Sequence, residues 1–504
     1  MKNPIKGLFL LPALIAGLGL MLTGRATAQT FTTLYNFSVD YVYFNGNVSN
    51  SDGYGPSGSL ILSNNTLYGT ASQGGSWGNG TVFAVNTNGT SFTNLHSFTA
   101  TSGSYPNYTN SDGYNPNGGL VLSGKTLYGT AFYGGTNGNG TVFVVNTNGT
   151  SFTNLHSFSP EATNRLGLYT NSDGYNPNGG LVLSGNTLYG TAYNGGTNGK
   201  GTVFAINTDG TGFTNLHNFT ATSVLSPNTN SDGANPHAGL ILSGNTLYGT
   251  ASGGGTNGSG TVFAVNTNGT GFTNLHSFMA INLPFPYTNS GGAGPYGGLI
   301  LSGNTLYGTT ADGGSAGAGT VYAINTNGTG FTNLHSLTNS DGGGPSASMI
   351  LSGNTLYGTT SDTVFTFNTN GSSFTVLMTF PDLEYNPNNG TETNGVGYNP
   401  DGSLVLSGNT LYGTANGGGT NGSGTVFKFS FGSVSAPQLA ILRSGTNVIV
   451  SWPVGATGFT LEFATNLVPP VVWNNNLPAP VVVNGQNVVT NGISGTRKFY
   501  LLSQ

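Results

Sequence analysis

The apolar positions of this chain come in short runs that recur along its length. In one stretch the runs cover residues 119–122, 126–131, 140–146 and 152–158, and turn-forming residues separate them. Short runs rich in β-branched and aromatic residues between turn residues predict strands. Asn148–Gly149 predicts a tight turn, because this dipeptide readily adopts positive φ. The stretch therefore predicts four antiparallel strands.

The same pattern returns with a fixed motif, Thr-Leu-Tyr-Gly-Thr, at intervals of 50 to 61 residues. Its seven tyrosines are Tyr68, Tyr128, Tyr189, Tyr248, Tyr307, Tyr357 and Tyr412. Four short strands in each such interval are typical of a β-propeller blade. Both faces of a blade strand are covered by neighbours, so the leucine and tyrosine are expected in the core, and the glycine is expected where backbones approach closely.

The seventh copy lacks the fourth run, Phe-Thr-Asn-Leu-His, whereas residues 31–37 match the equivalent residues 92–98. The start of the mature chain can therefore supply the outer strand of the last blade, which leaves no exposed sheet edge. We predict an all-β protein whose residues 29–432 form a seven-bladed β-propeller closed by an N-terminal strand. Residues 433–504 leave the repeat and predict a small β-sandwich.

The first 28 residues have the features of a signal peptide. Lys2 and Lys6 precede an apolar run over residues 7–22, and Ala-Thr-Ala stands before Gln29. We predict cleavage after Ala28 and a secreted, extracellular or cell-surface protein. No other apolar run reaches ~18 residues, so we expect no membrane span after cleavage.

Composition narrows the possible partners. Only 5% of the residues are charged, against roughly 25% in ordinary soluble domains. Cleavage removes Lys2, Lys6 and Arg25, which leaves seven basic and 15 acidic residues and a formal charge of −8. Nucleic acid is excluded as a partner, because phosphate binding needs clustered Lys and Arg. The chain has no cysteine, so disulfides cannot stabilise it, and we expect packing and ring closure to do so. Separately, we expect the protein to be a monomer.

The linkers between repeats end in Asn-Ser-Asp-Gly-x-x-Pro or a close variant, and they lie on the face whose loops vary most. Loops carry function more often than their scaffold does. Five acids at one position of these linkers are candidate ligand-binding residues: Asp52, Asp112, Asp173, Asp232 and Asp341. They could bind a cation or sugar hydroxyls, or they could accept backbone hydrogen bonds that shape the turn. Gly291 and Val396 interrupt the series.

Five histidines also share one position, in the fourth strand, where Tyr35 and Met378 replace them in the other two copies. They are His96, His156, His217, His276 and His335. A position that accepts Tyr and Met is structural, and histidines one blade apart are too distant to share a metal ion. We therefore expect no metal site and no cofactor. His237, beside Pro236 in a linker, suggests no role by itself.

Catalysis has weak support in the sequence. Glycoside hydrolysis needs two carboxylates about 5 to 9.5 Å apart, and Asp382, Glu384 and Glu392 form the only local acidic cluster. We favour a solvated acidic loop as the explanation of that cluster over a catalytic pair. No G-x-S-x-G or H-E-x-x-H motif occurs. We predict no catalytic residue.

The repeat, with Gly-Gly-Leu-Val-Leu-Ser-Gly-Asn-Thr-Leu-Tyr-Gly-Thr-Ala and Gly-Thr-Val-Phe-Ala-Val-Asn-Thr-Asn-Gly, resembles the Gloeo/Verruco (GloVer) tandem-repeat family of exported bacterial proteins. The resemblance covers about residues 31–430. It implies an extracellular or surface protein and implies no known catalytic residues. The tail, with Trp452 and Trp473 as expected core residues, resembles the immunoglobulin- or fibronectin-like modules of exported bacterial proteins.

These observations favour an exported, non-catalytic binding or scaffold module for an extracellular glycan, polymer or protein. Two alternatives remain open. One is a carbohydrate-active enzyme that uses the acidic loop over residues 382–392, and the other is a purely structural cell-surface protein.

Overall fold

The structure is a computed structural model, and it describes residues 29–39, 41–42, 48–103, 108–164, 167–282, 284, 286–386, 391–431, 439–454, 460–466, 471, 473–475, 477–483, 485–492 and 498–503. The expected signal peptide lies outside these residues. The chain divides into two compact units, of which one spans Phe31–Phe429 and the other includes Ser430–Gln504. The described residues form β-strands and contain one short 3-10 helix, η1 (Asn339–Asp341), but no α-helix.

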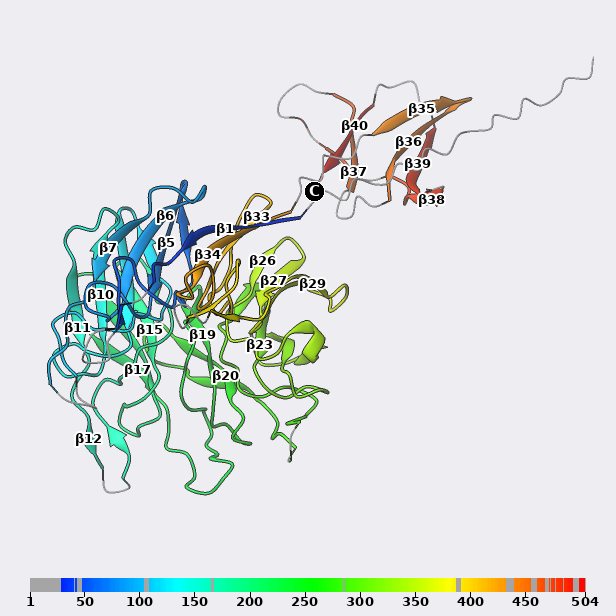
Figure 1. The fold of residues 1–504 in the computed structure, drawn as a ribbon. Helices are drawn as coiled ribbons and strands as arrows, with labels where there is room; N and C mark the ends of the chain where they lie inside the picture. The colour runs from blue at the N-terminus through cyan, green and yellow to red at the C-terminus, as the bar shows by residue number, and fades with distance from the viewer. Residues whose placement is uncertain are drawn as a thin grey trace, which may run out of the picture. The chain divides into compact units, whose positions relative to one another are not determined.

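The larger unit is built from four-stranded antiparallel sheets, one for each sequence repeat (Figure 1). Their strands are β1 (Thr30–Asn36), β4 (Ile61–Ser63), β5 (Thr66–Ala71), β6 (Thr81–Asn86), β7 (Thr93–Ser97), β8 (Val121–Ser123), β9 (Thr126–Ala131), β10 (Thr141–Asn146), β11 (Thr153–Ser157), β14 (Val182–Ser184), β15 (Thr187–Ala192), β16 (Thr202–Asn207), β17 (Thr214–Asn218), β18 (Ile241–Ser243), β19 (Thr246–Ala251), β20 (Thr261–Asn266), β21 (Thr273–Ser277), β22 (Ile300–Ser302), β23 (Thr305–Thr310), β24 (Thr320–Asn325), β25 (Thr332–Ser336), β26 (Ile350–Ser352), β27 (Thr355–Thr359), β28 (Thr363–Asn368), β29 (Thr375–Thr379), β32 (Val405–Ser407), β33 (Thr410–Ala415) and β34 (Thr425–Ser430).

Six of these sheets are meanders of consecutive strands, as in the order β4-β5-β6-β7. The prediction of four antiparallel strands in each repeat is therefore confirmed. The remaining sheet has the order β1-β34-β33-β32, so it combines the first strand of the unit with its last three. Figure 1 shows β1 lying along β34. A backbone hydrogen bond of 3.1 Å from the Phe37 N–H to the Gly424 carbonyl continues this pairing.

Tight turns and a bulge shape each sheet. In the first sheet Ile61 pairs with Tyr68 and Leu62 with Leu67, and the intervening Asn64 has a φ of 53°. Asparagine tolerates this left-handed conformation better than most residues do. The pairing of β6 with β7 shifts register between Val82 and Phe83, and a β-bulge of this kind increases the local twist of a strand.

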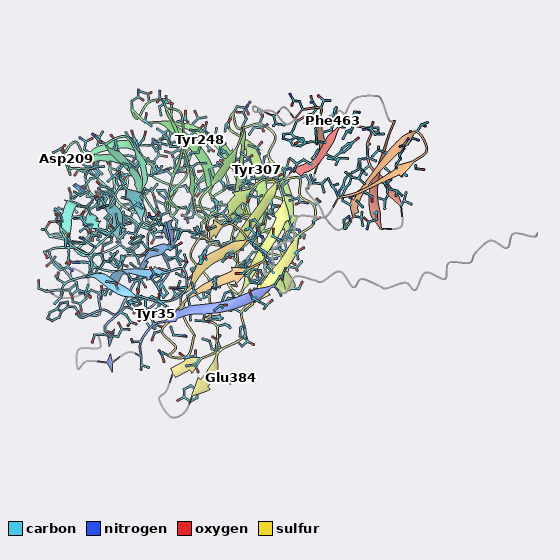
Figure 2. The ribbon with its side chains drawn as sticks, turned by 90° about the horizontal axis from the view of Figure 1, so that it is seen from above. Tyr35, Asp209, Tyr248, Tyr307, Glu384 and Phe463 are labelled. Atoms are coloured by element: carbon cyan, nitrogen blue, oxygen red, sulfur yellow. The ribbon has the colours of Figure 1, made fainter. Side chains whose placement is uncertain are left out.

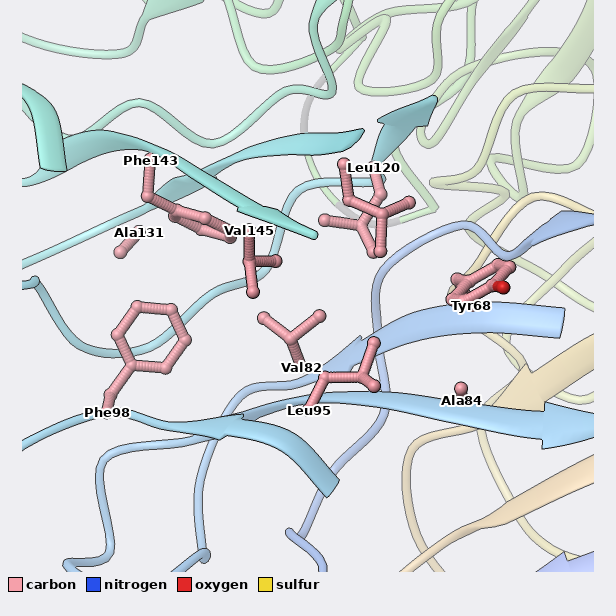
Figure 3. Close-up of a cluster of buried hydrophobic side chains, with 10 residues drawn as sticks. Tyr68, Val82, Ala84, Leu95, Phe98, Leu120, Ala131, Phe143 and Val145 are labelled. Atoms are coloured by element: carbon pink, nitrogen blue, oxygen red, sulfur yellow. The ribbon is translucent and has the colours of Figure 1, made fainter. Parts of the chain in front are cut away.

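The core lies between neighbouring sheets. One cluster combines Tyr68, Val82 and Leu95 of the first repeat with Leu120 and Phe143 of the second (Figure 3). Another combines Phe37 and Phe83 with Tyr412 and Val426, so the two ends of the unit share one core. Because each sheet buries its apolar residues against the next, the sheets stabilise one another.

The glycine of Leu-Tyr-Gly-Thr makes room for an aromatic ring. A Cβ atom on Gly69 would lie 2.6 Å from Phe83 Cζ and 2.8 Å from Leu60 Cδ2. The sequence predicted a close approach of backbones at this glycine, but in the structure the nearest atoms belong to side chains. Any larger residue here would displace the fully buried Phe83.

The linkers between repeats carry two-stranded hairpins in three places. Their strands are β2 (Tyr41–Val42), β3 (Val48–Ser49), β12 (Ala162–Thr163), β13 (Tyr169–Thr170), β30 (Glu384–Asn386) and β31 (Thr391–Thr393). The linker asparagine of Asn-Ser-Asp fixes the linker to the glycine-rich loop of its own repeat. Asn110 Oδ1 accepts hydrogen bonds from the backbone N–H groups of Gly113 at 2.9 Å and Gly135 at 3.0 Å.

The smaller unit contains a four-stranded sheet in the order β35-β36-β39-β38 and a two-stranded sheet, β37-β40. The strands are β35 (Ala440–Ser444), β36 (Asn447–Pro453), β37 (Thr460–Ala464), β38 (Val481–Val483), β39 (Gln486–Gly492) and β40 (Phe499–Ser503). Trp452 packs in its core with Val450, Leu461 and Val489, whereas Trp473 is only half-buried.

Candidate functional site

A cavity of about 630 Å³ is lined by the segment that precedes the first strand of every repeat. Within this segment, the residue directly after the conserved proline is polar in every copy and is drawn from five residue types. These residues are Ser57, Asn117, Asn178, His237, Tyr296, Ser346 and Asp401, and all seven line the cavity. We call them the polar ring. They lie on the side of the linkers, because in most copies the residue two positions before them pairs with the residue that follows the second strand. The Ser72 N–H, for example, donates to the Gly55 carbonyl at 3.1 Å.

Hydrogen bonds join half of the polar ring in one direction. Ser57 Oγ donates to Asn117 Oδ1 at 3.3 Å, and Asn117 Nδ2 approaches Asn178 Oδ1 at 3.5 Å. Asn178 Nδ2 in turn lies 2.9 Å from His237 Nε2. An amide N–H can only donate, so this His237 nitrogen accepts in the neutral imidazole. The bonds fix how these four side chains face the cavity.

His237 is held neutral by its surroundings. Burial lowers its pKa below the usual range, and a hydrogen bond with the Tyr296 backbone opposes this only in part. Its ring meets the rings of Tyr193 and Tyr296 edge to face, with centroids 5.8 and 5.3 Å apart. This part of the cavity wall is therefore aromatic and uncharged at neutral pH.

Asp401 is the acid of the polar ring. Burial raises the pKa of its carboxyl group, although hydrogen bonds with Ser346, Asn416 and Asn399 oppose the shift. Asn399 Nδ2 donates to Oδ2 at 2.7 Å, and Ser346 Oγ donates to Oδ1 at 3.3 Å. No lysine or arginine lines the cavity among the described residues.

The five predicted aspartates lie outside the lining of this cavity, five positions before the polar ring. Each pairs with the fourth-strand residue of the preceding repeat. His156 Nε2 lies 2.9 Å from Asp173 Oδ2, and the Ser159 N–H donates to both carboxylate oxygens at 3.1 Å. The equivalent pairs are His96–Asp112 at 2.8 Å, His217–Asp232 at 2.9 Å, His335–Asp341 at 3.3 Å and Tyr35–Asp52 at 2.6 Å.

These pairs hold each linker against the sheet that precedes it. Four of the aspartates are buried, and Asp341 is half-buried. Burial alone would raise the pKa of Asp232, but hydrogen bonds from His217 and Thr220 lower it below its usual value. The histidine is fixed on its other side as well, since the His96 ring stacks on Phe152 of the next repeat at a centroid distance of 3.6 Å.

The fifth repeat lacks this pairing, because Gly291 stands at the aspartate position and Met279 replaces the usual Ser or Thr. Burial lowers the pKa of His276 to about 4. The folded state therefore disfavours protonated His276, and this repeat loses stability as the pH falls from about 6.5, the pKa of an unfolded histidine, towards 4.

We expect Gly291→Asp to supply the missing carboxylate and stabilise the protein by about 1 kcal/mol at neutral pH, because it adds a hydrogen bond to a buried histidine. A Cβ atom on Gly291 would make only ordinary contacts, at 3.6 Å from Phe331 and 3.8 Å from Met279. The pKa of His276 should rise, so the acid sensitivity between pH 6.5 and 4 should shrink. Thermal melts across this pH range measure both effects.

Val396→Asp is the matched control, because it adds the same carboxylate opposite Met378, which offers no hydrogen bond. This variant is expected to lose stability. Equal effects of the two substitutions would contradict the pairing.

The acidic cluster near residue 384 lies on a projecting hairpin (Figure 2). Glu384 pairs with Thr393, and Tyr385 pairs with Glu392. Cross-strand partners share a face and successive residues alternate, so Glu384 and Glu392 point to opposite faces of the hairpin. With Asp382 they are exposed. The hairpin therefore does not place the carboxylates of Glu384 and Glu392 on the two sides of one glycosidic bond, as hydrolysis requires.

Sequence reasoning missed the polar ring. The signal was available, since the residue after proline changes type between copies while Leu-Tyr-Gly-Thr does not. A position that varies between copies of an otherwise constant repeat is not constrained by the packing of that repeat, and its side chain can serve binding instead. His237 belongs to this series, which explains its place beside Pro236.

Within the described part of the chain, no three His, Asp or Glu side chains gather in a group that could hold a metal ion. No described helix is long and apolar enough to cross a bilayer.

The fold and the cavity define an all-β protein of tandem four-stranded repeats with a polar cavity that every repeat helps to line. The chain belongs to the Gloeobacter/Verrucomicrobia repeat family, whose model matches residues 19–167, 159–290 and 282–444. No curated protein matches the chain.

Several solved structures are distantly similar. An oligogalacturonate lyase in complex with manganese is 11% identical, with a TM-score of 0.44, and the match covers 81% of this chain and 95% of that one. The extracellular domain of a proposed hybrid two-component system from B. thetaiotaomicron is 10% identical, with a TM-score of 0.43, and the match covers 84% of this chain but only 43% of that one. Likenesses at this level carry no argument about activity.

Proposed function

We propose that this protein is an exported, non-catalytic binding module, a seven-bladed β-propeller that binds an extracellular glycan, polymer or protein at the linker-bearing mouth of its central cavity. The observation that carries the proposal is the polar ring. Its seven side chains line one cavity, and they vary where the rest of the repeat is constant. Concave sites with a few convergent polar groups are the usual form of ligand pockets.

Three contacts support the closure of the repeat sheets into a ring. β1 completes the sheet of β32, β33 and β34. The Ser403 N–H donates to Ser59 Oγ at 3.2 Å, which joins the last repeat to the first. Phe37 shares a core with residues of the seventh and first repeats. Closure of this kind protects sheet edges and gives the cavity a continuous wall.

The predicted signal peptide over residues 1–28 and the family membership support export to the extracellular space or the cell surface. The small C-terminal unit would then serve as a spacer or attachment module. The exposed, diverging carboxylates of Glu384 and Glu392 favour binding over hydrolysis.

The test is binding of the mature chain, residues 29–504, to a panel of polysaccharides with and without calcium, with reducing-end products assayed in the same samples. Saturable binding without products is the expected result. Loss of binding on chelation would support the five aspartates as cation ligands, which stays a prediction. Released products would contradict the non-catalytic proposal.

Point variants test whether the ligand binds in the cavity or at the linker hairpins. Tyr296→Ala and His237→Ala should each weaken binding at least about tenfold, because each removes a ring of the cavity wall. Tyr385→Ala is the control, since Tyr385 is 66% exposed on the hairpin of β30 and β31. Binding that depends on Tyr385 and not on Tyr296 would move the site to the linkers.

A further inference from the structure

The cavity has a second layer, two residues further along each segment, where every copy carries glycine or serine. We call it the inner ring. Its members are Ser59, Gly119, Gly180, Gly239, Gly298, Ser348 and Ser403, and all of them line the cavity. The serines are consecutive around the ring, in the sixth, seventh and first repeats, and the glycines occupy the second to the fifth repeats.

In the serine half, each hydroxyl group accepts a hydrogen bond from the inner-ring N–H of the preceding repeat. The Gly298 N–H donates to Ser348 Oγ at 2.9 Å, and the Ser348 N–H donates to Ser403 Oγ at 3.0 Å. The Ser403 N–H donates to Ser59 Oγ at 3.2 Å. These bonds satisfy three backbone N–H groups inside the cavity.

The glycine half joins its repeats differently. A strand threonine donates to the carbonyl oxygen just before the inner-ring residue of the next repeat, as Thr130 Oγ1 does to Gly179 at 3.3 Å. The other such bonds run from Thr70 to Gly118, from Thr191 to Ala238 and from Thr250 to Gly297, at 3.2, 2.9 and 3.1 Å. In the serine half the equivalent hydroxyls of Thr309, Thr359 and Thr414 are buried without a partner among the described residues.

The glycines leave an arc of unpaired donors. The backbone N–H groups of Ser59, Gly119, Gly180 and Gly239 form no hydrogen bond with the described part of the chain. A Cβ atom on Gly180 would lie 3.2 Å from the Gly119 oxygen and 3.5 Å from the Gly119 nitrogen, whereas one on Gly239 would lie only 2.6 Å from the Gly180 oxygen. No side chain therefore occupies the place of the serine hydroxyl next to the Gly119 N–H, where one would fit tightly, and the place next to the Gly180 N–H is too narrow for one.

We propose that this arc binds the oxyanionic group, a carboxylate or a sulfate, of an acidic saccharide that enters the cavity. Ligand oxygens in the cavity would accept hydrogen bonds from these N–H groups. Backbone N–H groups that converge on one site can stabilise a negative charge, even when they come from separate segments, and an ionised oxygen is a stronger acceptor than a neutral one. An N–H group left unpaired in a cavity carries a desolvation penalty, which a ligand oxygen or a water molecule offsets.

The polar ring above the arc favours a saccharide. Ser57, Asn117, Asn178 and His237 belong to the same four repeats as the unpaired N–H groups. Hydroxyl, amide and imidazole groups both donate and accept hydrogen bonds, as sugar hydroxyls do. The rings of His237 and Tyr296 add an aromatic surface to this wall, and aromatic rings pack against the apolar faces of sugar rings.

The inference rests on the proposed function, and its test distinguishes a failure of the oxyanion site from a failure of the proposed function. The mature protein is titrated by calorimetry with D-glucuronate, D-glucose and acetate. Glucuronate should bind at least tenfold more tightly than glucose, which lacks the carboxylate, and than acetate, which lacks the hydroxyls.

Gly180→Ser should reduce glucuronate affinity at least tenfold, because its hydroxyl would accept the Gly119 N–H as Ser348 accepts that of Gly298. Gly119→Ser is the second variant in case Gly180→Ser fails to fold. Gly253→Ser is the control, because a Cβ atom there meets nothing nearer than 3.8 Å and Tyr133 and Asn194 stand at the equivalent positions of other repeats. It should leave the affinity unchanged.

Equal binding of glucuronate and glucose, absence of binding by both, or an unchanged affinity in both serine variants would overturn the oxyanion site. Tighter binding of a short peptide through its terminal carboxylate would overturn the saccharide assignment. If polysaccharides of the panel still bind in a Tyr296-dependent way, the proposed function survives either result. If nothing in the panel binds, the proposed function fails for a glycan ligand, and the oxyanion site fails with it.

Discussion

Deleting residues 29–38 from the mature chain is expected to prevent stable folding of the repeat unit. The deletion removes β1 and exposes the unpaired edge of β34, which would then be open to pairing with other chains. It also removes Phe37, which is fully buried in the core shared by the first and last repeats. Circular dichroism melts and size-exclusion chromatography should show a large loss of thermal stability together with aggregation.

Point variants measure how much the buried Phe37 side chain contributes to the free energy of unfolding. Phe37→Ala should cost about 3–5 kcal/mol, as truncations of buried phenylalanines do. Val39→Ala, at an exposed position two residues further on, should change stability by less than about 0.5 kcal/mol. An unchanged melting temperature in the deletion would mean that β1 does not complete the ring.

Asp173→Ala is expected to destabilise the protein by about 2–4 kcal/mol, because it leaves the His156 ring and the Ser159 N–H without their acceptor in a buried site. Chemical denaturation at pH 7 measures the effect. Asp209→Asn is the control. Asp209 is an exposed turn residue whose contacts with Thr211 match those that Asn148 makes with Thr150 in the second repeat.

The His–Asp pairs between the fourth strands and the linkers should also determine how the stability of the protein changes at acidic pH. Because the folded pKa of Asp232 is lowered, its contribution to stability is present above the unfolded pKa of about 3.9 and is lost as the pH falls through the folded value. Asp173→Ala behaving like Asp209→Asn would contradict a structural role for the pairs.

The sequence was sufficient to predict strands and turns, because each is set by residues close together in the chain. The run at residues 126–131 and the glycine after Ser123 specify a hairpin locally. The match between residues 31–37 and 92–98 predicted a long-range pairing, since both segments carry one repeated pattern. That pattern served as an internal alignment.

Contacts across a linker could not be predicted in the same way. His156 and Asp173 were each singled out by repetition, but nothing in the order of the residues says that the linker folds back to join them. The role of Gly69 depends on the ring of Phe83 in the neighbouring strand, which a propensity argument does not reach. Gly180 and Ser348 occupy equivalent positions of the inner ring. The sequence could not predict what this difference does, because it does not show which N–H group lies beside each residue.

The central claim is that the ligand sits in the cavity of the polar ring. Amide hydrogen exchange of the mature protein, with and without the polysaccharide that binds most tightly in the panel, tests it most directly. The predicted result is slower exchange in the segments 57–60, 117–120, 178–181 and 237–240, each of which contributes residues to the cavity lining. Protection confined to the hairpins over residues 162–170 and 384–393, with the cavity segments unchanged, would contradict the claim.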